Sequence, residues 1–129
     1  MRRILNYGHT FGHSLEAITQ HEIPHGIAVA WGVDVANFLS LRRSILTEED
    51  FLVIHDFIVQ HFSYRISCTV SAEELIQTAQ RDKKISDGKL NMVLLERPGS
   101  LKIVPISFDE ALATTITEYL RSSHVVYWD

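Results

Sequence analysis

Three histidines, His9, His13 and His25, are the residues whose type and spacing best suit chemistry. A helix advances about 100° per residue, so His9 and His13, four residues apart, are expected to share one helix face, with Glu16 on the same stripe. His25 follows a short break that contains Pro24 and is expected to open the next helix. Imidazoles that converge from two helices are typical ligands of a borderline-soft divalent metal. The spacing therefore predicts a metal or anion site.

A structural role is the alternative, because a lone histidine on an apolar helix is more often a buried structural residue than a ligand. Here Asn6 is expected on the same face as His9 and His13, and Gly8 and Gly12 would let a ligand approach the backbone closely. This combination favours a metal or anion site over a purely structural role for the histidines. The sequence HExxH, which places a general base between two ligands, is absent, since a threonine stands at the glutamate position.

Length and composition predict one intracellular domain. A chain of 129 residues can bury its own core, and a net charge of −4 argues against nucleic acid as a partner. The single cysteine, Cys68, excludes an internal disulfide and fits a reducing compartment. We find no signal peptide and no apolar run long enough to cross a bilayer, so we expect a cytoplasmic protein without a membrane partner.

Apolar periodicity predicts the helices that carry the histidines. The first is expected from about Arg3 to Thr19 and the second from His25 to Arg43. The second is apolar almost all round, broken by Asp34 and Asn37, which is typical of a helix in the middle of a bundle.

Capping patterns predict three further helices, which begin after Thr47, Ser71 and Ser107. Between about residues 90 and 105, two short apolar runs flank Arg97-Pro98-Gly99-Ser100 and predict a hairpin. The apolar tail, residues 122–129, is expected to dock onto a neighbour or subunit. The predicted fold class is mainly α, a helical bundle with a small β-hairpin.

A second polar cluster runs from Arg81 to Lys84 and is followed by Asp87-Gly88-Lys89. Taken alone, such a cluster is more often a solvated turn. The alternative is that a lysine of this cluster lies over the metal site and binds an anion, to which Arg2 and Asn6 could also contribute. Four other histidines lack comparable context and are interpreted as structural or exposed: His21, His55, His61 and His124.

Four segments resemble the 3-dehydroquinate synthase family: Arg2-x-x-Leu5-Asn6-x-Gly8-His9-Thr10-Phe11-Gly12-His13-x-x-Glu16, His25-Gly26-x-Ala28-Val29-Ala30, Asp82-Lys83-Lys84 and Val93-Leu94-Leu95. The resemblance covers nearly the whole chain but only the C-terminal, mostly helical domain of a two-domain fold. It implies that residues 1–129 are the metal- and substrate-binding domain and that the NAD-binding N-terminal domain is absent from this chain.

The resemblance implies a carbon–oxygen lyase of the shikimate pathway that uses NAD and zinc, or cobalt in its place. It would convert 3-deoxy-arabino-heptulosonate 7-phosphate to 3-dehydroquinate with loss of phosphate. In the family a glutamate from the nucleotide-binding domain and two histidines hold the metal, and these histidines correspond to His9 and His25.

The remaining family residues surround the phosphorylated substrate. His13 corresponds to a histidine near the substrate phosphate that takes part in proton transfer. Arg2, Asn6 and a lysine of the Asp82-Lys83-Lys84 motif correspond to contacts with substrate anions. We assign the catalytic lysine to Lys83 and a further substrate contact to Lys84.

Two departures from the family pattern qualify these assignments. Ile27 stands where the family usually has glutamate after His-Gly, which keeps open a related sugar-phosphate cyclase. No strand, glycine-rich turn and helix for a dinucleotide is found, so we expect further sequence upstream. We therefore expect no cyclase activity, and weak zinc binding, if any, by this chain alone. The whole assembly is expected to be a homodimer. Alternatives are a metal-dependent polyol dehydrogenase and a helical module without catalysis.

Overall fold

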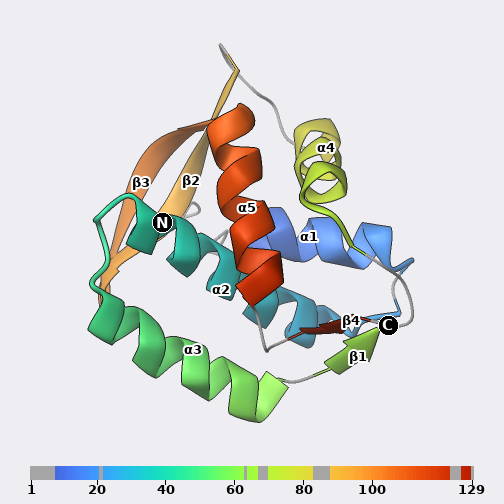
Figure 1. The fold of residues 1–129 in the computed structure, drawn as a ribbon, viewed down its shortest axis with the longest axis horizontal. Coiled ribbons are helices and arrows are strands. Elements are labelled where there is room, and N and C mark those ends of the chain that lie inside the picture. The colour runs from blue at the N-terminus through green and yellow to red at the C-terminus, as the bar shows by residue number, and fades with distance from the viewer. Residues whose placement is uncertain are drawn as a thin grey trace.

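In a computed structural model, residues 8–20, 22–62, 64–66, 70–82, 88–122 and 126–128 are described, with side chains at all of them except 9, 64–66, 82, 122 and 126–128. This part of the chain forms five helices and two pairs of strands (Figure 1): α1 (His9–Ile18), α2 (His25–Arg42), α3 (Glu48–Phe62), β1 (Tyr64–Ile66), α4 (Ala72–Asp82), β2 (Lys89–Arg97), β3 (Ser100–Ser107), α5 (Glu110–Ser122) and β4 (Val126–Trp128). The predicted fold class, mainly α with a small hairpin, is confirmed.

Helix α2 is the centre of the fold, as its apolar sequence predicts. It packs against α1, α3, α5 and β2, and these three helices lie around it in Figure 1. Its indole-bearing residue, Trp31, is fully buried, and its Nε1–H donates a hydrogen bond of 2.9 Å to the carbonyl oxygen of Phe62 on α3. Ser40 donates a hydrogen bond to the carbonyl oxygen of Leu95 and so ties α2 to the hairpin.

Helices α1 and α2 cross with their backbones in contact, because glycines lie at the crossing. A Cβ atom on Gly32 of α2 would lie 1.9 Å from the carbonyl oxygen of Gly8 and 2.6 Å from the amide nitrogen of Gly12. No side chain larger than hydrogen fits there without moving a backbone. This contact fixes where α1 lies on α2.

The predicted start of the first helix is wrong. Gly8 has a φ of 80° and is the N-cap of α1, so the helix begins at His9 and not near Arg3. A residue in the left-handed region cannot continue a right-handed helix. Asn6 lies outside the described residues, so its place relative to His9 and His13 stays a prediction.

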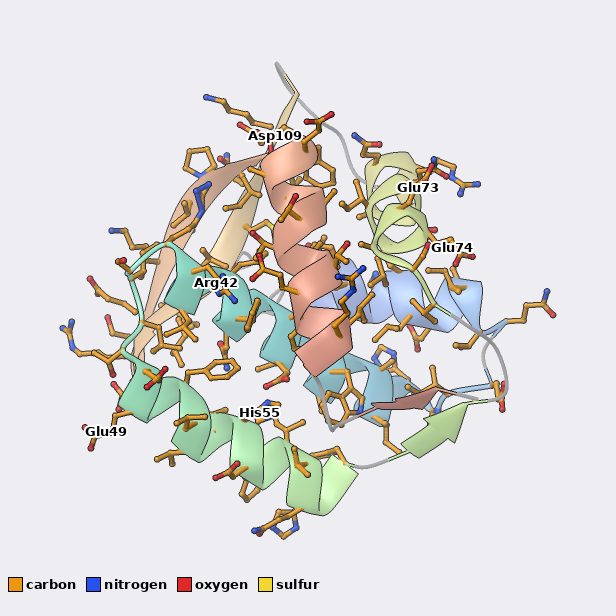
Figure 2. All side chains as sticks on the ribbon, in the orientation of Figure 1. Arg42, Glu49, His55, Glu73, Glu74 and Asp109 are labelled. Atoms are coloured by element: carbon orange, nitrogen blue, oxygen red, sulfur yellow. The ribbon has the colours of Figure 1, made fainter. Side chains whose placement is uncertain are left out.

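The caps of α3 and α4 form as predicted, and acidic residues occupy the N-terminal turns of both helices in Figure 2. The Thr47 hydroxyl accepts a hydrogen bond from the amide of Asp50 at 3.2 Å. Before α4, the amide of Glu74 donates to the Ser71 hydroxyl at 3.1 Å, and the Glu74 carboxylate accepts from the Ser71 amide at 3.2 Å. This reciprocal pair is a capping box.

The predicted cap of α5 is wrong by two residues. Asp109, labelled in Figure 2, caps the helix through its carboxylate, which accepts a hydrogen bond of 3.0 Å from the amide of Leu112. Ser107 is instead the last residue of β3. An aspartate is at least as good an N-cap as a serine.

The hairpin of β2 and β3 is antiparallel, as predicted, and turns at Pro98 and Gly99. The tail also docks, but on its own chain: β4 pairs in parallel with β1, with Tyr64 opposite Val126. Strand β1 was not predicted from the sequence. In the described residues, no helix combines the length and the apolar character needed to cross a membrane.

Candidate metal and substrate site

His13 and His25 come together where α1 ends and α2 begins. Their ring centroids are 6.3 Å apart, and the ring planes are inclined by 31°. The chain reverses between them because Gln20 adopts a φ of 53° after α1, and because Ile23 is buried and Pro24 holds the extended conformation that precedes a helix. The predicted convergence of imidazoles from two helices is confirmed for these two rings.

Glu16 contacts His25, one of the two histidines. One carboxylate oxygen of Glu16 lies 2.7 Å from Nδ1 of His25. The Glu16 side chain is 12% exposed and the His25 side chain 62% exposed, so the carboxylate lies mostly inside the fold and the imidazole extends outward. Because Glu16 follows His13 by three residues, the carboxylate and the ring of His13 lie on the same side of α1.

This contact suits a metal-binding imidazole. A carboxylate only accepts, so Nδ1 of His25 is the protonated nitrogen in the neutral ring, and Nε2 carries the lone pair. Metal-bound histidines almost always donate their other N–H to a carboxylate, carbonyl or water in this way. The donor set at the start of α2 therefore fits a divalent metal.

The other predicted ligand, His9, is the first residue of α1, one turn before His13, and its side chain lies outside the described residues. Within the described side chains, no group of three or more histidine, cysteine, aspartate and glutamate residues is placed to hold a metal. The pairing of His9 with His25 around one ion stays a prediction.

The predicted anion contacts, Arg2, Asn6, Lys83 and Lys84, all lie outside the described residues. The two lysines directly follow α4, whose last residue is Asp82, and α4 packs against α1. The chain that carries them therefore leaves a helix adjoining the one that bears His13. Their contacts with substrate stay predictions.

The two described cavities lie away from the imidazoles. A cavity of about 260 Å³ lies between α2, β3 and α5, lined by Arg42, Arg43 and Asp109 among others, and does not include either histidine. Another, of about 450 Å³, lies between α1 and α4 and is lined by Glu74 and Arg81 but again by neither ring. Gly26, next to His25, has no atom within 4 Å of where its Cβ would be.

Comparison with known proteins agrees with these features. The family model described as 3-dehydroquinate synthase C-terminal matches residues 1–85, which include the histidine segment and the lysine motif. The chain belongs to the 3-dehydroquinate synthase C-terminal family.

Relatives within this family span most of the chain. The 3-dehydroquinate synthase of Solibacter usitatus is 39% identical over 105 residues, which are 81% of this chain and 29% of that protein. The enzyme of Dichelobacter nodosus is 37% identical over 126 residues, 95% of this chain and 33% of that protein. The chain thus spans about a third of the length of these relatives.

The fold has been seen in solved structures. A crystal structure of 2-deoxy-scyllo-inosose synthase complexed with carbaglucose-6-phosphate, NAD+ and Co2+ superposes with a TM-score of 0.74 at 24% identity. The match covers 89% of this chain and 33% of that chain. At this identity the match shows the fold alone, and this is the fold expected from the sequence.

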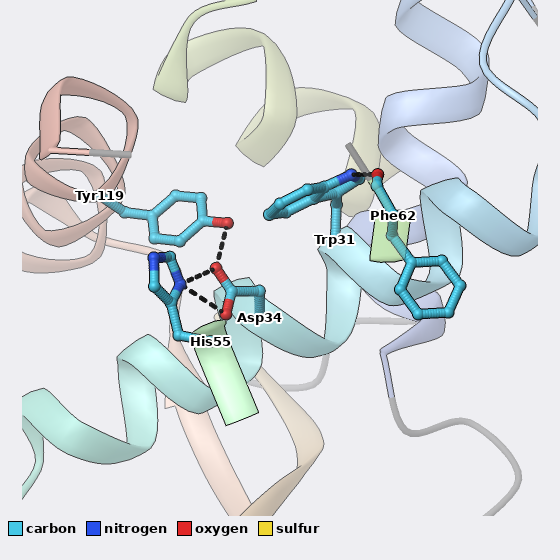
Figure 3. A network of polar contacts seen from close by, with 5 residues as sticks. All are labelled: Trp31, Asp34, His55, Phe62 and Tyr119. Carbon is cyan, nitrogen blue, oxygen red and sulfur yellow. Dashed lines mark hydrogen bonds and ion pairs between the residues drawn. The ribbon is translucent and has the colours of Figure 1, made fainter. Parts of the chain in front are cut away.

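A second histidine–carboxylate group lies in the middle of α2 and was not predicted (Figure 3). Asp34 is fully buried and accepts a hydrogen bond of 2.7 Å from the Tyr119 hydroxyl of α5. Nδ1 of His55, on α3, lies 3.0 Å from each of the two Asp34 oxygens. His25 precedes Asp34 by nine residues, or about 13 Å along the helix axis, so the two groups are separate.

The charges of this second group perturb one another. The hydrogen bond to Asp34 raises the pKa of His55 above 6.5; burial opposes this, while the charges of Asp34 and Asp56 reinforce it. Burial, with the Asp34 charge and hydrogen bond, raises the pKa of Tyr119 well above 10.0. The sequence signal was Asp34 itself, because a carboxylate in an apolar helix requires partners.

Proposed function

We propose that this chain is the metal- and substrate-binding part of a 3-dehydroquinate synthase. The reaction would convert 3-deoxy-arabino-heptulosonate 7-phosphate to 3-dehydroquinate and phosphate in the shikimate pathway, with the NAD-binding domain supplied outside this chain. The observation that carries the proposal is the convergence of His13 and His25 beside Glu16 at the junction of α1 and α2. Membership of the family supports it.

In this proposal His9 and His25 hold zinc or cobalt, together with a glutamate of the nucleotide-binding domain. The metal supplies Lewis acidity at a substrate hydroxyl, and NAD supplies a reversible hydride acceptor. His25 projects from the fold at the start of α2, with 62% of its side chain exposed, which leaves it accessible to a ligand from another domain. Glu16 accepts a hydrogen bond from Nδ1–H of His25 and keeps the ring oriented.

His13 moves a proton at the phosphate end of the substrate. It lies nearly one turn before Glu16 on α1. Its ring centroid is 6.3 Å from that of His25, close enough for both to face one small substrate. Lys83 assists as the catalytic cation, while Arg2, Asn6 and Lys84 bind substrate anions. Cations and hydrogen-bond donors around a leaving phosphate stabilise the charge that develops on it.

The direct test is to replace the corresponding third of the Dichelobacter nodosus enzyme with this chain and to measure phosphate release from the heptulosonate phosphate. We expect NAD- and metal-dependent release that His9→Ala and His25→Ala each abolish. Lys102→Ala, a control at an exposed residue of β3, should leave the rate of phosphate release unchanged. A fused protein that binds NAD but releases no phosphate contradicts the proposal. The chain alone should give no release, and turnover by it would show that no other domain is needed.

A related sugar-phosphate cyclase is the second candidate, and Ile27 favours it. Ile27 stands where the family usually has glutamate, and its side chain is partly buried and packs against the core. A panel of sugar phosphates given to the same fused protein distinguishes the two. Faster phosphate release from another substrate would assign the chain to the related cyclases.

Two further alternatives predict different results. A polyol dehydrogenase needs no phosphate contacts, so Lys83→Ala and Asn6→Ala would leave oxidation of an unphosphorylated polyol unchanged. A helical module without catalysis would bind no zinc, and His9→Ala would change nothing. The homodimer is also a proposal, which sedimentation of the fused protein tests.

A further inference from the structure

We propose that Glu16 is a positioning residue, which fixes His25 in the Nδ1–H tautomer and thereby presents Nε2 to the metal. This inference rests on the proposed function, because it gives His25 the role of a ligand. Glu16 itself would touch neither the metal nor the substrate. Its effect would pass entirely through the imidazole of His25.

The position of the Glu16 carboxylate is set by the packing of α1. The neighbouring residue Leu15 and the earlier Phe11 are both buried in the core. The backbone contact at Gly32 fixes α1 against α2, the helix that bears His25. The carboxylate is therefore held by a rigid element, while the ring that it contacts extends into open space.

The N-cap and the first turn of α2 supply no carboxylate of their own for this task. Its N-cap is Pro24, which offers no side-chain hydrogen bond, and the first turn contains no acidic residue. A carboxylate near a helix N-terminus is favoured by the helix dipole. Glu16, from another helix, brings that charge to the side chain of the first residue of α2 at 2.7 Å.

An ordinary surface ion pair is the competing interpretation, and it makes a different prediction. Such a pair requires a protonated imidazole and contributes little when exposed. A positioning contact holds the neutral ring in one tautomer. The tautomer of His25 therefore separates the two interpretations without any metal or substrate.

The first measurement is the tautomer of His25, read from long-range ¹H–¹⁵N correlations of the metal-free chain at about pH 8, where ordinary imidazoles are neutral. We expect Nδ1–H in the unaltered chain and in Glu16→Gln, whose amide oxygen can still accept a hydrogen bond from Nδ1–H. Glu16→Ala should lose this preference. Glu49→Gln, a matched change of an exposed glutamate on α3, should keep it.

The second measurement is zinc affinity, followed through the same imidazole resonances up to millimolar zinc, in the range where weak binding is visible. We expect Glu16→Ala to weaken binding by about 10- to 100-fold, the usual effect of removing the carboxylate behind a metal-bound histidine. Glu16→Gln should weaken it less, and Glu49→Gln not at all. His25→Ala gives the loss expected when the ligand itself is removed.

Two results overturn the positioning role and leave the proposed function intact: an Nε2–H tautomer in the unaltered chain, or equal zinc affinities of the unaltered chain and Glu16→Ala while His25→Ala abolishes binding. If His25→Ala and His9→Ala both leave zinc binding unchanged, the metal site fails and the role of Glu16 fails with it. If millimolar zinc shifts neither resonance of the chain alone, the same variants are compared in the fused protein, which contains the nucleotide-binding domain.

Discussion

Helix α2 carries two histidine–carboxylate pairs that differ in nearly every respect. At its first residue, His25 meets Glu16 with side-chain exposures of 62% and 12%. In its middle, Asp34 meets His55 with exposures of 0% and 16%. The first pair lies at the junction of α1 and α2, and the second connects α2 to α3 and, through Tyr119, to α5.

The difference shows how the same two chemical groups serve two purposes. Around Asp34, both carboxylate oxygens accept hydrogen bonds from other helices, so the group holds three helices in register. At the start of α2, Glu16 contacts one nitrogen of His25 and directs the other outward. Burial therefore separates a structural pair from a pair suited to bind a ligand.

The largest effect is expected where the backbones of α1 and α2 touch. Gly32→Ala places a Cβ atom 1.9 Å from the Gly8 carbonyl oxygen, so the helices must separate. We expect a loss of unfolding free energy of about 3 kcal/mol, at the upper end for overpacking, and a wider separation of His13 from His25. Urea denaturation measures the first and nuclear Overhauser contacts between the rings the second. Unchanged stability would show that the crossing is not tight.

The next largest loss of stability is expected at the buried pair of Asp34 and His55. Asp34→Ala leaves the Tyr119 hydroxyl and the His55 ring without their acceptor, and we expect a loss of about 3 kcal/mol in urea denaturation. Tyr119→Phe, the matched control, removes one hydrogen bond and should cost about 1 kcal/mol. In both variants His25 should keep its tautomer. A change of that tautomer in Asp34→Ala would mean that the two pairs are coupled.

The pH dependence of stability should originate in the buried pair. Because the pKa of His55 is raised above 6.5 in the fold, its stabilising contribution is complete below that pH and is lost as the pH rises through the raised value. Stability measured by urea denaturation from about pH 6 to pH 8.5 should therefore fall. His55→Gln should flatten the profile. An equally steep profile in that variant would contradict this origin.

The smallest effect is expected at the other glycine of α2. Gly26→Ala adds a methyl group where no atom lies within 4 Å, so the unfolding free energy should stay unchanged or rise by up to about 1 kcal/mol from helix propensity. The same denaturation experiment compares it with Gly32→Ala. A loss of unfolding free energy as large as that of Gly32→Ala would show that the start of α2 is packed as tightly as its crossing with α1.

Features encoded locally could be predicted from the sequence. The apolar surface of α2, the capping box at Ser71 and Glu74, and the turn of the hairpin each depend on residues a few positions apart. The spacing of His13 and His25 around a break likewise predicted that their rings would converge. Periodicity and capping rules apply directly to such features.

Features that depend on distant partners could not be predicted. Asp34 is separated by 21 residues from His55 and by 85 from Tyr119, and no local pattern joins them. The pairing of β1 with β4 is of the same kind. The start of α1 after Gly8 was missed for another reason, since periodicity does not reveal that a glycine adopts a positive φ.

The central claim is that His9 and His25 hold one divalent ion with His13 beside it. Cobalt soaked into crystals of the fused protein, which also contains the nucleotide-binding domain, and located by its anomalous scattering, tests this most directly. The account predicts one strong peak at about 2.1 Å from a ring nitrogen of both His9 and His25, with Glu16 on the far side of the His25 ring. A peak bound to other residues, or none at this junction, would contradict it.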